Sequence, residues 1–209
     1  NSKGDRRLFS IEEESKEINE FFLYILNKHK ENILKVSSIK NLYLHSVMAG
    51  HLINDKPNSS SGGDGDDEWH IDQHFELFKI IVYLSDVDEK NGPFSYLEGS
   101  HSKLIQLFIL FFFKLFSKDP TRLSKKLTGI IKKLFFLNQK TFIGKKGTCI
   151  VFNSAGIHKG LIIENGERIS ITAYIFPFRK DNNIIYERNK HMNIPANLIK
   201  KNYENFLKL

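Results

Sequence analysis

Hydrophobic and polar residues follow two different periods along this chain, and each period predicts a different kind of element. Near the beginning, apolar side chains recur every three or four residues, which is the spacing of an amphipathic helix. We expect this helix to cover about 10–35, with Ser10 and Glu13 forming a capping box at its start. Its apolar stripe consists of Ile18, Phe22, Ile25 and Leu26.

Further along, the period shortens to two, which is the spacing of a half-buried strand. The clearest case is 168–176, where isoleucine and alanine side chains share one face and polar side chains share the other. The polar face carries Arg168, Ser170, Thr172 and Tyr174. Other β-branched and apolar runs also predict strands, and these runs are 41–53, 79–84, 94–97 and 147–152.

The stretch 102–146 returns to the helical period and is strongly basic. It contains eleven lysine or arginine residues and a single acid, Asp119. We expect two amphipathic basic helices here, about 103–117 and 120–136, with Asp119 and Pro120 at the start of the second. A glycine- and serine-rich loop is expected at 58–68, and a further helix at about 195–208.

Composition adds three expectations. The hydrophobic fraction of 41% is sufficient for one folded domain over 1–209, and the formal net charge of +7 favours an anionic partner or substrate. Cys149 is the single cysteine, so no internal disulfide can form, and we expect it to be buried in its apolar run. The first residues are polar and the apolar run 104–116 is too short to cross a bilayer, so we expect a cytoplasmic protein.

Four polar residues suggest metal chemistry. His70 and Asp72 are two residues apart and therefore suit one side of a strand, while His158 and Arg168 follow later, around the last predicted strand. Two imidazoles and one carboxylate can occupy one face of an iron(II) octahedron and leave the other positions open. Arg168 can then hold the far end of a dicarboxylate. Each residue alone also has an ordinary interpretation, as a hydrogen-bonded histidine or as a surface charge.

Several motifs, taken in order, resemble the phytanoyl-CoA dioxygenase family over about 68–177. The motifs are Trp69-His70-Ile71-Asp72, the run 79–87, Asn91-Gly92-Pro93-Phe94 with Tyr96 and Gly99-Ser100-His101, and the run 147–152 followed by His158 and Arg168. The resemblance implies a double-stranded β-helix, a cupin-like jelly roll, with its core at about 41–101 and 147–177. The basic helices at 102–146 would then be an insertion.

The resemblance also implies an iron(II)- and 2-oxoglutarate-dependent dioxygenase. The metal ligands would be His70, Asp72 and His158, and O2 would be the second co-substrate. Arg168 would pair with the distal carboxylate of 2-oxoglutarate, and Ser170 would add a hydroxyl. Related halogenases carry a small residue where this chain has Asp72, so the carboxylate favours hydroxylation.

Lys79 and the basic stretch leave alternatives open. Lys79 is either a second anchor for an anionic group or a lysine at the edge of the sheet. Phe111 to Phe113 either pack on the β core or touch a membrane surface. A small or medium organic substrate that bears phosphate or carboxylate, or is linked to a carrier, suits the basic charge. No nucleic-acid-binding module is recognisable. The rivals to an oxygenase are a non-catalytic jelly-roll module that binds metal or ligand, and a peripheral membrane-associated protein.

Overall fold

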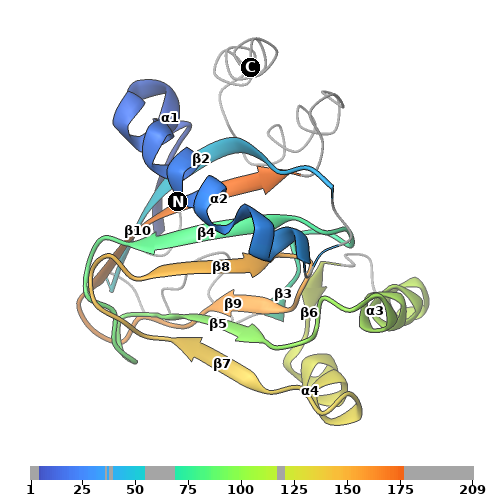
Figure 1. Ribbon diagram of the computed structural model, residues 1–209. Coiled ribbons are helices and arrows are strands. Elements are labelled where there is room, and N and C mark those ends of the chain that lie inside the picture. Colours follow the sequence, from blue (N-terminus) through green and yellow to red (C-terminus); the bar gives the residue numbers. More distant parts are fainter. Residues whose placement is uncertain (1–4, 36, 38–39, 55–68, 117–120, 177–209) are drawn as a thin grey trace.

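The computed structural model describes residues 5–35, 37, 40–54, 69–116 and 121–176 (Figure 1). Most of these residues belong to two five-stranded sheets in which every paired strand is antiparallel to its neighbour. The prediction of a mainly β, jelly-roll-like fold is confirmed at this level. The loop expected at 58–68, the helix start expected at 119–120 and the helix expected at 195–208 lie outside the described residues.

The first sheet has the strand order β1-β2-β10-β4-β8. Its strands are β1 (Asp5–Phe9), β2 (Tyr43–Ile53), β10 (Glu167–Phe176), β4 (Phe78–Tyr83) and β8 (Cys149–Asn153). The second sheet has the order β6-β3-β9-β5-β7. Its strands are β6 (Arg122–Leu123), β3 (Trp69–His70), β9 (His158–Gly160), β5 (Phe94–Leu97) and β7 (Gln139–Phe142). The stretch 102–146 therefore also contributes two strands, β6 and β7, to the second sheet.

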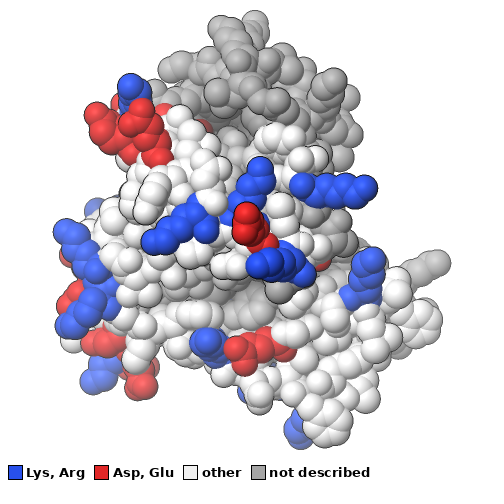
Figure 2. Space-filling model, in the orientation of Figure 1, with Lys and Arg blue, Asp and Glu red and all other residues white. Residues whose placement is uncertain are grey.

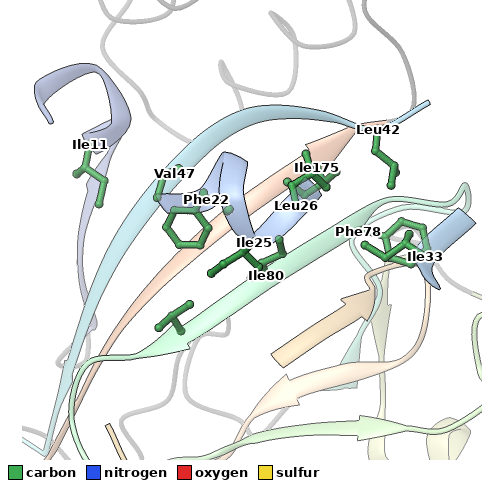
Figure 3. Close-up of a cluster of buried hydrophobic side chains, with 12 residues drawn as sticks. Ile11, Phe22, Ile25, Leu26, Ile33, Leu42, Val47, Phe78, Ile80 and Ile175 are labelled. Carbon is green, nitrogen blue, oxygen red and sulfur yellow. The ribbon is translucent and has the colours of Figure 1, made fainter. Parts of the chain in front are cut away.

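The helix near the beginning covers the outer face of the first sheet, because its apolar stripe packs there. Phe22 is completely buried, and Ile25, Leu26 and Ile33 are nearly so. Figure 3 shows these side chains facing those of β2, β4 and β10. On the sheet side the cluster includes Val47, Ile80 and Ile175. The predicted apolar stripe is thus confirmed, with Ile18 packed at its margin.

The predicted capping box is wrong, and the helix is interrupted. The chain forms a short α1 (Ile11–Glu14) and then α2 (Lys16–Lys35), separated by Ser15 in an extended conformation. Ser10 has the left-handed angles φ 61 and ψ 36, and its side chain makes no cap hydrogen bond. Ser15 instead accepts a hydrogen bond from Ile18 N at 3.3 Å, so it caps α2.

The strand β10 has the alternation that the sequence predicts, and the structure gives each face a different environment. Ile171, Ala173 and Ile175 face the cluster under α2. The polar face is buried as well, with Arg168, Ser170, Thr172 and Tyr174 each less than 9% exposed. These polar side chains point between the two sheets, beside an aromatic cluster that contains Tyr83, Phe94, Tyr96 and Phe152.

Helices α3 (Lys103–Phe116) and α4 (Lys125–Leu134) cover one end of the second sheet. Ile105, Ile109, Leu127 and Ile131 are their buried contacts, and Phe108 packs edge-on against Phe135 at 5.4 Å between ring centroids. Within the described residues, the second helix begins later than predicted. Arg122 and Leu123 pair with β3, so the helix begins at Lys125, and Ser124 caps it by accepting from Leu127 N at 3.2 Å.

Two further expectations concern the burial of Cys149 and the presence of a membrane-spanning helix. Cys149 is exposed rather than buried, because it begins β8, an edge strand of the first sheet. Among the described residues, no helix combines the length and the apolar composition that crossing a membrane requires.

Candidate metal and co-substrate site

The structure brings His70, Asp72 and His158 together. His70 on β3 and His158 on β9 are direct partners in an antiparallel pair, so their side chains project to the same face. Their ring centroids are 4.4 Å apart. Each of the three residues offers one ligand atom, and these atoms all lie within 4.8 Å of one another. A group of this size and composition can hold one metal ion.

The backbone around Asp72 fixes its carboxylate beside both histidines. Strand β3 ends at His70, and the fully buried Ile71 then anchors the turn, with its N–H donating to Thr121 O at 2.9 Å. The N–H of Asp72 donates to Ser154 O at 3.0 Å. Asp72 Oδ2 consequently lies 3.8 Å from His158 Nε2. The short strand and the turn after it therefore bring His70 and Asp72 to the same point.

A tight turn before β9 orients His158. The His158 Nδ1 atom lies 2.8 Å from Gly156 O, so Nδ1 carries the proton and donates it. The lone pair of Nε2 is then directed towards Asp72. Gly156 is required in this turn, since a Cβ at that position would overlap the Tyr96 ring. Tyr96 in turn donates its hydroxyl to Asn153 O at 3.0 Å.

Two buried polar side chains, Ser100 after β5 and Gln106 on α3, form hydrogen bonds with the turn before β9. Ser100 Oγ accepts from Ile157 N at 2.7 Å and donates to Leu97 O at 2.6 Å. Gln106 on α3 donates to Ala155 O at 2.7 Å and to Ser100 O at 3.0 Å. The Gly99-Ser100-His101 motif thus has a structural role at the site. Gln106, buried in an otherwise apolar helix, is a signal that sequence reasoning missed.

Both histidines are neutral at physiological pH. The pKa of His158 is lowered to about 4, mainly by burial; the charges of Lys79 and Arg122 act in the same direction and that of Asp72 opposes them. Burial also lowers the pKa of His70 well below its usual value, helped by the neighbouring His158. A neutral imidazole is the form that donates a lone pair to a metal. The protonation state therefore suits metal binding without a further change.

Lys79 lies inside the site, not at the edge of the sheet. Its Nζ is 2.6 Å from Asp72 Oδ2, and the ammonium sits 4.7 Å from the centroid of the Tyr174 ring. Lys79 on β4 is the direct partner of Tyr174 on β10, which explains why both point between the sheets. The lysine neutralises Asp72 in the metal-free protein.

Arg168 and Ser170 lie deeper between the sheets, on the polar face of β10. Arg168 is 6% exposed, and its Nη1 donates a hydrogen bond to Gly92 O. The next residue, Pro93, accepts a hydrogen bond from Leu161 N at 2.9 Å. Burial lowers the pKa of Arg168, while Tyr83 and Asp5 act in the opposite direction. Arg168 is therefore held beside the turn at Gly92 and Pro93.

Ser170 follows Arg168 on the same buried face of β10, and a glycine faces it. Gly50 on β2 is the strand partner of Ser170, and a Cβ added there would come within 3.6 Å of Ser170 Oγ. Thr172 continues the same polar face towards Tyr174. The predicted residues Arg168 and Ser170 therefore share one buried row.

Sequence reasoning missed two arginines near the triad. Arg122 on β6 is the direct partner of His70, and its charge lowers the pKa of both histidines. Arg7 lies on β1, and its Nε donates to Asp5 Oδ2 at 2.9 Å. Burial lowers the pKa of Arg7, but Asp5, Tyr174 and Asp72 together raise it above its usual value. Strand β1 has five residues, and the first three are charged, so its sequence gives no clear alternation.

Three buried polar atoms beside the triad lack a hydrogen-bond partner among the described residues: Gln73 Nε2, His74 Nε2 and Ser154 Oγ. Buried polar groups are normally satisfied, so atoms of this kind indicate room for a ligand or water. The other ring nitrogen of His74 lies 3.1 Å from Gln106 Oε1. These atoms add polar groups to the surroundings of the Asp72 turn.

Comparison with known proteins identifies the fold. No protein-family model and no curated protein matches the sequence. Among solved structures, the non-heme alpha-ketoglutarate-dependent epimerase SnoN from nogalamycin biosynthesis matches with a TM-score of 0.51 and 15% identity. SnoN in complex with Fe3+, alpha-ketoglutarate and nogalamycin RO matches with a TM-score of 0.54 and 13% identity. Both similarities cover 83% of this chain, which spans 61% and 63% of those two chains.

Proposed function

We propose that the protein is an iron(II)- and 2-oxoglutarate-dependent oxygenase of the phytanoyl-CoA dioxygenase family, with His70, Asp72 and His158 as its metal ligands. The observation that carries the proposal is the group of two neutral imidazoles and one carboxylate within 4.8 Å. This donor set suits iron(II) with open coordination positions. The SnoN complex with Fe3+ and alpha-ketoglutarate, which has the same fold, supports it.

In this proposal 2-oxoglutarate lies along the polar face of β10. Arg168 binds its distal carboxylate in a charge-assisted pair, and Ser170 donates its hydroxyl to the same group. Thr172 and Tyr174 continue this face from Ser170 as far as Lys79, which contacts Asp72. Lys79 provides a second positive charge at the metal end of the co-substrate, where it now contacts Asp72.

Iron and 2-oxoglutarate, when bound, would supply the chemistry that activates O2 and oxidises a C–H bond. The residues of the chain would hold both in position and exclude water from them. Phe94 and Phe152 pack around His158, with ring centroids 5.7 Å and 5.2 Å away. Their bulk excludes water from the buried side of the triad. Asp72 occupies the position of a protein ligand, which favours hydroxylation over halogenation. This outcome follows from the family resemblance.

The charges around the triad favour an anionic substrate of small or medium size. Lys79, Arg122 and Arg7 each act on the triad, and Asp72 is the one acid among the three ligand candidates. With a dipositive metal and the dianionic co-substrate added, and with Arg7 paired with Asp5, the site would still carry a positive excess. A substrate with a carboxylate or phosphate group would offset this excess.

The proposal is tested by anaerobic titration of the protein with iron(II) and 2-oxoglutarate. We expect a weak visible charge-transfer band, which His158→Ala abolishes. The matched control is His51→Ala, since His51 lies at the surface beside Glu167. A band of equal strength in His158→Ala would refute the ligand assignment.

Turnover is then measured as succinate released in air during a screen of carboxylate- and phosphate-bearing compounds. A band without succinate release for any of them would favour the non-catalytic module. Because SnoN is an epimerase, product analysis has to distinguish an added hydroxyl from an inverted centre.

A further inference from the structure

Helix α3 is apolar on nearly all sides. Ile105 and Ile109 are buried against the end of the second sheet, but the opposite side is apolar too. Leu104, Leu107 and Phe111, at 67%, 64% and 64%, are strongly exposed. A helix that is hydrophobic all round is normally buried in a protein or in lipid. Something is therefore expected to cover its outer side.

The neighbouring helix and the turn after it extend this apolar surface. Ile130 and Leu134 on α4 are 41% and 54% exposed, four residues apart and thus on one side of the helix. Phe136 follows with 90% exposure and a positive φ of 52°. We call these six residues the α3–α4 face: Leu104, Leu107, Phe111, Ile130, Leu134 and Phe136.

The two helices that form the α3–α4 face carry charge of one sign. Together they contain six lysine residues and no aspartate or glutamate. On α4, Lys126 and Lys133 lie at helical spacing from Ile130, and on α3 Lys103 lies four residues before Leu107. Figure 2 shows the lobe formed by α3 and α4 as white, with blue side chains beside it.

We propose that the α3–α4 face binds the surface of an anionic lipid bilayer. Exposed leucine and phenylalanine side chains would insert among the acyl chains near the headgroups, and the lysines would contact the anionic headgroups. A second copy of the chain is a poorer occupant, because pairing two such faces would bring like charges together.

The position of α3 connects this face to the triad. Gln106, on the inner side of the same helix, holds the turn before His158. Docking would place the candidate site close to the lipid surface. The membrane proposal does not depend on the proposed oxygenase activity, because its observations are exposure and charge on a different surface.

The test is co-sedimentation of the chain with vesicles of phosphatidylcholine alone or mixed with phosphatidylserine, at low salt. We expect binding to the anionic vesicles only. Leu107→Glu combined with Phe111→Glu should weaken that binding at least about tenfold. The matched control is Leu8→Glu with Tyr24→Glu, which adds the same charge at residues that are 64% and 62% exposed elsewhere.

A second variant checks the electrostatic part. Lys126→Gln with Lys133→Gln should weaken binding to the anionic vesicles by about fivefold per lysine. Circular dichroism establishes that each variant is folded. Failure of the unmodified chain to bind anionic vesicles, or an equal loss in the matched control, overturns the proposal. A second outcome also overturns the proposal: the unmodified chain sediments as a dimer and does not bind vesicles, and Leu107→Glu with Phe111→Glu dissociates this dimer. A second copy of the chain would then cover the face.

Discussion

At the scale of single residues, Lys79 and Asp72 form the contact that most affects the site. The Lys79 side chain is 11% exposed, and its ammonium is stabilised by the Asp72 carboxylate and by the face of the Tyr174 ring. An isolated ammonium would be very unfavourable there. A metal ion bound by the triad would compete with Lys79 for the same carboxylate.

This competition gives a prediction with two opposite parts. Lys79→Met should raise the affinity of the protein for iron(II) or cobalt(II) about tenfold, because a nearby positive charge is removed. The same variant should need about tenfold more 2-oxoglutarate, because one of two cations for the co-substrate is lost. Both are measured by anaerobic titration. A weaker metal affinity, or an unchanged 2-oxoglutarate requirement, would contradict the role proposed for Lys79.

Replacing Arg168 should weaken the binding of 2-oxoglutarate and leave the affinity for iron(II) unchanged. Arg168→Gln is expected to raise the 2-oxoglutarate concentration needed for the charge-transfer band at least roughly 30-fold. Losing one partner of a buried charge pair costs about 2–5 kcal/mol, and about 1.4 kcal/mol corresponds to a factor of ten. The iron(II) affinity without co-substrate should be unchanged. Arg6→Gln, on the exposed side of β1, is the matched control. Equal co-substrate requirements in the two variants would mean that Arg168 is structural.

At the scale of elements, helix α2 supports the first sheet from outside while the polar face of β10 looks inward. The same strand therefore connects the hydrophobic cluster under α2 with the buried row that contains Arg168 and Ser170. Packing on one face limits the movement of side chains on the other, because cores are close-packed. The helix thus contributes to the geometry of a site that it does not touch.

Phe22 is the residue that tests this support. Phe22→Ala should lower the free energy of unfolding by about 3–5 kcal/mol, since it leaves a cavity in a fully buried cluster. The adjacent Phe21 is 46% exposed, and Phe21→Ala should change the stability by less than about 1 kcal/mol. Urea denaturation of the two variants provides the comparison. Similar losses in both would show that the burial of Phe22 is not what stabilises α2 on the sheet.

At the scale of the whole molecule, the two sheets enclose ionisable groups that water would otherwise solvate. His158 is 3% exposed, and burial lowers its pKa from 6.5 to about 4. Burial lowers the pKa of His70 in the same direction. Between about 4 and 6.5 the unfolded chain binds a proton that folded His158 does not bind. Stability must therefore rise with pH in this window.

In the metal-free protein, titration of His158 should not reduce the free energy of unfolding above pH 6.5. It should reduce this free energy progressively as the pH falls from 6.5 towards about 4. The loss due to His158 alone is about 3 kcal/mol. Urea denaturation across this pH window measures it in protein treated with a chelator. His158→Gln, which cannot titrate, should show a shallower slope. Equal slopes in the two proteins would contradict the assigned pKa shift.

Local pattern was enough to predict β4 and β10, which carry Lys79, Arg168 and Ser170, but not the short β9, which carries His158. The alternation from Arg168 to Tyr174 identified β10 and its polar face, because a strand exposes side chains with a period of two. The start of α4 could not be predicted in this way. Arg122 and Leu123 leave the helical pattern to pair with β3, and that pairing partner is remote in sequence. Tertiary hydrogen bonds overrode a locally favourable helix start.

By itself, the sequence determined which side chains could take part in metal chemistry and on which face of a strand several of them lie, because residue type and spacing are local properties. Only the tertiary structure decided that His70 lies opposite His158, that Lys79 turns inward to Asp72, and that the outer side of α3 stays uncovered. The physical reason is that strand pairing and burial depend on contacts between distant segments, and the free energy of those contacts is not contained in any local window.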